Sequence, residues 1–75
     1  MAIESLGREP LAKHRARLGL TQLELAEKAG LERSLVNRYE NGRGGLPGLK
    51  NATKLARALG VRIDDIAFTS EQSTL

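Results

Sequence analysis

The chain has 75 residues, no cysteine, an aromatic content of 3% and a formal net charge of +3. A chain this short forms at most one domain, and without cysteine it has neither a disulfide nor a thiolate ligand for a metal. Its core must therefore consist of aliphatic side chains, as in a small helical bundle, and the basic pI near 9.8 fits a polyanionic partner.

The first residues carry neither the basic nor the apolar segment of a secretory signal, and no apolar run reaches membrane-spanning length. We therefore expect a cytoplasmic protein with no membrane partner. Alternating β-branched residues are absent, so β-structure is not expected. We predict a single domain over residues 1–75, with an ordered core at about 8–68 and a frayed tail at 69–75.

The first predicted helix covers about residues 8–18. Pro10 suits the first turn of a helix, and Leu11, Arg15 and Leu18 follow at helical spacing. Arg15 interrupts this apolar stripe.

An unpaired arginine in a core costs several kcal/mol or more, so Arg15 needs either solvent or a carboxylate. Glu40 lies four residues after Val36, near the core face of a later helix. We predict that Arg15 and Glu40 form an ion pair inside the domain. The alternative is two solvated surface charges.

The next helix begins near Gln22, because Thr21 and Glu24 have the spacing of a capping box. Its apolar positions are Leu23, Ala26 and Ala29. Gly30 adopts a left-handed backbone conformation easily, and therefore ends this helix in a sharp turn.

A further amphipathic helix covers about residues 32–40. Its apolar face comprises Leu31, Leu35, Val36 and Tyr39, and its opposite face comprises Arg33, Ser34, Asn37, Arg38 and Asn41. The second face consists entirely of hydrogen-bonding side chains. Two short helices joined at one glycine are typical of a helix-turn-helix, which indicates DNA binding.

Residues 43–48 are rich in glycine and include a proline, so they form a loop. A helix over about 48–59 follows, with apolar positions at Leu49, Ala52, Leu55, Ala56 and Leu59. A last short helix is expected over 63–68, where Asp64 and Asp65 in the first turn favour the helix dipole.

Several segments share the register of one known pattern. They are Gly19-Leu20-Thr21-Gln22, Leu25-Ala26, Gly30, Val36, Arg38, Glu40-Asn41-Gly42, Pro47 and Leu55-Ala56-Arg57-Ala58-Leu59-Gly60-Val61. Over residues 8–68 the chain resembles the Cro/C1-type, or XRE-type, helix-turn-helix regulators. The resemblance implies an all-α, compact five-helix bundle like the lambda-repressor DNA-binding domain. It also implies a dimer that places the helix at about 32–40 in the major groove of a palindromic operator.

The resemblance also implies roles for individual residues. Positions that reach base edges match Arg33, Ser34 and Arg38, and Asn37 lies beside them. Positions that contact phosphates match Gln22, Asn41 and Arg43, and Arg15 with Glu40 matches an internal ion pair. Chemistry supports these roles, because arginine pairs with guanine and asparagine with adenine in the major groove. The alternative for each residue is a solvated surface position.

Two features depart from the family pattern. Glu32 stands where serine or threonine usually caps the second helix of the motif, which predicts a weaker cap. Gly44, Gly45 and Gly48 make the following loop looser than in most members.

The residues do not assemble a catalytic or metal site. His14 is the only histidine and is expected to be exposed, and the adjacent Asp64 and Asp65 point in different directions on a helix. We therefore expect neither an enzyme nor a cofactor.

We expect a sequence-specific repressor of a bacterium or phage that binds double-stranded DNA as a homodimer. Ile63, Ile66 and Phe68 are candidates for the dimer contact, although Ile63 and Ile66 can equally close the core of the monomer. Two alternatives remain open. The chain can be the antitoxin of a toxin–antitoxin pair, with a toxin or other protein partner, or the DNA-binding fragment of a longer regulator.

Overall fold

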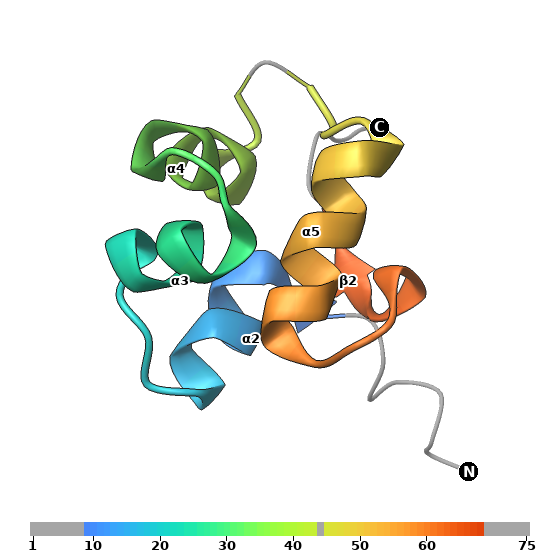
Figure 1. The fold of residues 1–75 in the computed structure, drawn as a ribbon. Coiled ribbons are helices and arrows are strands. Elements are labelled where there is room, and N and C mark those ends of the chain that lie inside the picture. The colour runs from blue at the N-terminus through green and yellow to red at the C-terminus, as the bar shows by residue number, and fades with distance from the viewer. Residues whose placement is uncertain (1–8, 44, 69–75) are drawn as a thin grey trace, which may run out of the picture.

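A computed structural model describes residues 9–43 and 45–68 of the chain. In this part, four α-helices surround one core (Figure 1). The elements in chain order are β1 (Glu9–Pro10), α2 (Leu11–Arg17), α3 (Gln22–Ala29), α4 (Arg33–Asn41), α5 (Leu49–Leu59), the 3₁₀ turn η1 (Ile63–Asp65) and β2 (Ile66–Ala67).

The core is aliphatic, as the composition predicts. Leu25 of α3, Val36 of α4 and Leu55 of α5 are its largest fully buried side chains. Leu11 of α2 and Ile66 of β2 complete the same cluster. The four helices thus share one hydrophobic centre, which leaves the outer face of α4 free for polar side chains.

The helix-turn-helix follows from local sequence signals. The Thr21 side chain accepts a hydrogen bond from the Glu24 backbone, and the Glu24 side chain accepts one from Thr21 N, at 3.0 and 2.8 Å. At the other end, Gly30 has φ +74°, and Leu31 N donates to Ala26 O at 2.8 Å. This arrangement closes α3 and directs the chain into α4. The predicted capping box and glycine turn are confirmed.

The prediction of five helices is wrong at the C-terminal end of the domain. Residues 63–68 form the single 3₁₀ turn η1 and the strand β2. β2 pairs in parallel with β1, with Glu9 opposite Ile66 and Pro10 opposite Ala67. The expectation of no β-structure is therefore also wrong. Each strand has only two residues, which is too short for an alternating pattern to be visible in the sequence.

His14 is the clearest error about a single residue, because it is buried with 4% exposure. Arg17 donates to its Nδ1 at 3.3 Å, so its Nε2 carries the hydrogen and donates to the Asp65 carbonyl at 2.7 Å. We call the contact of α2 and β1 with η1 and β2 the terminal seam. The seam holds both ends of the described chain together.

Three predicted apolar positions face solvent instead. Leu18, Leu23 and Leu49 are 51%, 51% and 76% exposed. Leu18 lies beyond α2, which begins only after Pro10 and ends at Arg17. Leu25, rather than Leu23, packs with the alanines of α3 because α5 and α4 cover that side of the helix.

Candidate nucleic-acid interface

The outer face of α4 is polar and accessible. Arg33, Ser34 and Arg38 are exposed, and no side-chain hydrogen bond ties them to another described residue. Asn37, on the same helix, is half-buried. The face therefore combines three exposed hydrogen-bonding side chains with the half-buried side chain of Asn37.

An ion pair lies beneath this face. Arg15 of α2 donates from Nε to Glu40 Oε2 at 2.6 Å and from Nη2 to Oε1 at 3.1 Å. A third donor, Nη1, bonds to the Leu20 carbonyl at 2.8 Å. The Glu40 side chain is 6% exposed and that of Arg15 21%. Hydrogen bonding to Glu40 raises the pKa of Arg15 above its usual value, although burial opposes this shift. The structure thus brings together the two charges that the sequence predicts to pair.

A chain of amides leads from this pair to the surface. Gln22 Nε2 donates to Glu40 Oε1 at 2.9 Å, and Asn37 Nδ2 donates to Gln22 Oε1 at 3.3 Å. Asn41 Nδ2 then donates to Asn37 Oδ1 at 3.2 Å. We call these five residues, from Arg15 through Glu40, Gln22 and Asn37 to Asn41, the polar relay.

The polar relay has one direction because a carboxylate only accepts hydrogen bonds. Gln22 must therefore turn its amino group towards Glu40 and its oxygen towards the outer face of α4. That oxygen can only accept, so Asn37 must offer its amino group in turn. The charge of Glu40 thereby determines which way the Asn37 amide points.

The sequence pattern was not used to predict the hydrogen bond between Asn41 and Asn37. Asn37 and Asn41 are four residues apart on one helix, a spacing that brings side chains into contact. That spacing was the available signal.

The three predicted phosphate-contacting residues lie at the start of α3 and at the end of α4. Gln22 is the first residue of α3, where backbone N–H groups are free and the helix dipole is positive. Asn41 ends α4 and Arg43 follows the left-handed Gly42, both exposed. Glu32 is the N-cap of α4 and makes no side-chain cap hydrogen bond, as its departure from the family pattern predicts.

The candidates for dimer contact have different surroundings. Ile66 is 3% exposed and belongs to the core. Ile63 and Phe68 are half-buried against that core. Ile66 therefore closes the monomer, the alternative that the sequence left open for it. Of the three candidates, Ile63 and Phe68 retain exposed surface.

Two absences can be stated for residues 9–43 and 45–68. No three histidine, cysteine, aspartate or glutamate side chains gather there into a group suited to a metal ion. None of the helices in this part is both long enough and apolar enough to cross a membrane.

Comparison with known proteins agrees with the fold. Residues 11–66 match the family described as Helix-turn-helix. The chain belongs to this helix-turn-helix family, of the Cro/C1 or XRE type. Its members are transcriptional regulators rather than enzymes, and the chain is thus a DNA-binding transcriptional regulator.

Similar proteins come from archaea and from a phage. An HTH-type transcriptional regulator of Methanothermobacter thermautotrophicus is 45% identical over 62 residues, which cover 81% of this chain and 88% of that protein. One from Methanocaldococcus jannaschii is 43% identical over 56 residues, covering 75% and 83% of the two chains. The cryptic phage CTXphi transcriptional repressor RstR of Vibrio cholerae is 36% identical over 59 residues, 79% of this chain.

Two consequences follow from these relatives. The chain spans about half of RstR, since the match covers 52% of that repressor. The archaeal relatives do not support the expectation that the source is a bacterium or a phage.

Proposed function

We propose that the protein is a dimeric repressor that inserts α4 into the major groove of a palindromic operator. In this proposal Arg33, Ser34, Asn37 and Arg38 contact base edges, and Gln22, Asn41 and Arg43 contact the DNA backbone. The similarity to RstR, a phage repressor, supports repression.

The polar relay is the observation that carries the proposal. A solvated helix face needs no internal support, yet Asn37 is connected through Gln22 to a Glu40 carboxylate with 6% exposure. An asparagine held in this way is suited to bidentate pairing with adenine N6 and N7, because its orientation is set before DNA arrives.

The exposed arginines supply the other half of the chemistry. Arg33 and Arg38 can each donate two parallel hydrogen bonds to guanine O6 and N7. Gln22 adds a phosphate contact at the start of α3, which fixes the register of the domain on the duplex. A two-fold dimer repeats these contacts at half-sites about one helical turn apart. Ile63 and Phe68 are the residues that we assign to the dimer contact.

Selection of bound sites from a random duplex library tests this function. We expect an inverted repeat whose affinity falls steeply with salt, as counterion release requires. Weak binding without sequence preference would contradict the proposal.

Arg38→Ala tests the assignment of α4 within the selected site. It should lose about 1–3 kcal/mol of specific binding and relax preference at one base pair. Arg62→Ala is the matched control, because Arg62 has the same charge, is exposed and lies outside the helix-turn-helix, at the N-cap of η1. An equal loss on specific and random DNA would make Arg38 a phosphate contact.

A further inference from the structure

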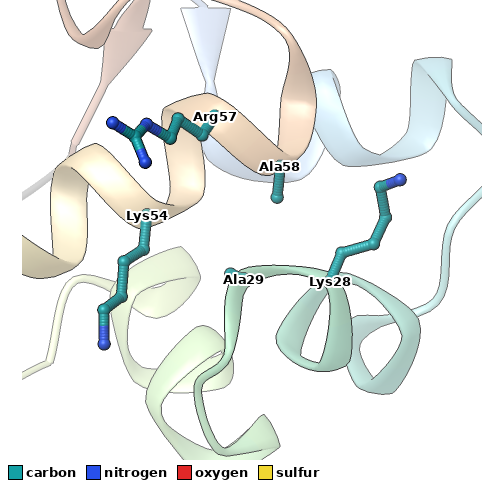
Figure 2. Close-up of a pocket in the computed structure, with 5 residues that line it drawn as sticks. All are labelled: Lys28, Ala29, Lys54, Arg57 and Ala58. Carbon is teal, nitrogen blue, oxygen red and sulfur yellow. The ribbon is translucent and has the colours of Figure 1, made fainter.

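A second charged feature lies away from the outer face of α4. A hollow of about 360 Å³ opens between α3 and α5, and its lining residues are Lys28, Ala29, Lys54, Arg57 and Ala58 (Figure 2). We call it the basic hollow. None of its residues belongs to the polar relay or to the DNA contacts proposed above.

Small and cationic side chains together shape the basic hollow. Figure 2 shows Ala58 of α5 pointing towards the end of α3 at Ala29. Lys28 lies to one side of the two alanines, and Lys54 and Arg57 lie to the other. Two alanines leave open space where larger residues would fill the gap between α3 and α5. The long cationic side chains border that space, and no carboxylate lines it.

The three cations take part in none of the ion pairs of the described chain. Neither an ion pair nor a side-chain hydrogen bond to Lys28, Lys54 or Arg57 occurs within residues 9–43 and 45–68. Lys54 and Arg57 are three residues apart on α5, a spacing at which like charges repel. An acidic ligand would relieve this repulsion.

Helix dipoles explain only part of this charge. Lys28 and Arg57 stand in the last turns of α3 and α5, where cations are favourable. Lys54 lies in the middle of α5 and gains nothing from either helix end. Neither helix dipole therefore accounts for the charge of Lys54 at the hollow.

The position of the basic hollow separates it from DNA in the proposed complex. Gln22 begins α3 and contacts phosphate in that complex, whereas Lys28 lies six residues further along, about 9 Å away on the helix axis. The hollow thus lies at the opposite end of α3 from the proposed phosphate contact.

We propose that the basic hollow binds an acidic segment of a partner protein, through aspartate or glutamate side chains. The cations are complementary to the carboxylates of the segment. The alanines can contact the methylene groups of its aspartate or glutamate side chains. The lining offers no aromatic ring on which a nucleobase could stack and no side-chain acceptor to select one. The hollow is also open to solvent, which suits an extended peptide segment better than a small molecule that must be enclosed.

NMR titration of the ¹⁵N-labelled full chain with hexaglutamate peptide, at physiological salt, tests this proposal. We expect amide shifts confined to Lys28, Ala29 and the stretch from Lys54 to Ala58, and none with hexaglutamine. The titration uses the free protein, so its result does not depend on whether operator binding is correct. Shifts spread over all basic surfaces would overturn the proposal.

Matched charge reversals distinguish a site from general attraction. Lys54→Glu with Arg57→Glu should raise the Kd for hexaglutamate about tenfold or more. Lys50→Glu with Arg62→Glu makes the same change in net charge outside the hollow and should raise the Kd less than about threefold. Equal losses would overturn the proposal. Lys28→Glu, on the other helix, provides the same test if the first pair fails to fold.

Two competitors separate the remaining possible occupants. Inorganic phosphate that reproduces the peptide's shifts, with the same dependence on the variants, would make the hollow a free-anion site. Saturating duplex DNA that displaces the peptide would make it part of the DNA interface. We expect neither result, and either one would replace the partner-protein proposal.

Discussion

The polar relay and the terminal seam both hold distant parts of the chain together, but they do so by different means. In the relay, side chains bond to side chains, beginning at the Arg15–Glu40 pair, whose carboxylate is buried, and ending on the exposed face of α4. In the seam, His14 bonds to a backbone carbonyl and two short strands pair through their backbones. The seam contributes to the stability of the fold, whereas the relay also fixes the orientation of the Asn37 amide on the outer face of α4.

The largest effect should come from removing one charge of the relay. Arg15→Met leaves Glu40 buried without its partner and should lower the free energy of unfolding by about 3–5 kcal/mol. Urea denaturation measures this loss. The double variant Arg15→Met with Glu40→Met replaces both charges by apolar groups and should recover at least half of it. A loss below about 1 kcal/mol in the single variant would show that the pair is effectively solvated.

A smaller loss of stability is expected from the terminal seam. His14→Phe keeps a ring in the core but removes the donor to the Asp65 carbonyl, and should cost about 1–3 kcal/mol. Lys13→Ala, at the exposed neighbouring position, is the control. Selected operator sites should remain the same in both variants. A change in base preference for His14→Phe would contradict the distinction between seam and relay.

The smallest effect is predicted for base preference. Glu40→Gln keeps an oxygen for Arg15 Nε but can place an amino group where Oε1 accepts from Gln22 and from Arg15 Nη2. The Arg15 Nη2 bond is then lost, and the Gln22 and Asn37 amides can reverse. Preference at the base pair that faces Asn37 should weaken by about 1 kcal/mol, or roughly fivefold.

Comparing selected sites for wild type and variant tests this effect, with Glu27→Gln of the exposed face of α3 as the control. An unchanged preference in the Glu40 variant would mean that the carboxylate does not orient the asparagine.

The sequence predicted the motif well because its signals are local. A capping box, a left-handed glycine and the polar positions of α4 all depend on residues within one or two turns. The position of Arg15 was also informative, because the cost of burying an unpaired charge demands a partner.

The errors concern contacts that no local rule determines. His14 bonds to a backbone carbonyl 51 residues away, and any residue type could supply that acceptor. Leu23 and Leu25 both share helical spacing with alanines of α3, and only the packing of the other helices decides which one is buried. The two-residue strands depend on the closure of the whole fold in the same way.

In the proposed complex, the direction of the polar relay also limits how operator preference can diverge among related proteins. Position 37 must offer a donor to the Gln22 oxygen, so asparagine, glutamine or serine can stand there, whereas aspartate would place two acceptors face to face. Arg33, Ser34 and Arg38 carry no such constraint from a described side chain. New base preferences should therefore arise first at these three positions, while position 37 changes only together with its neighbours in the relay.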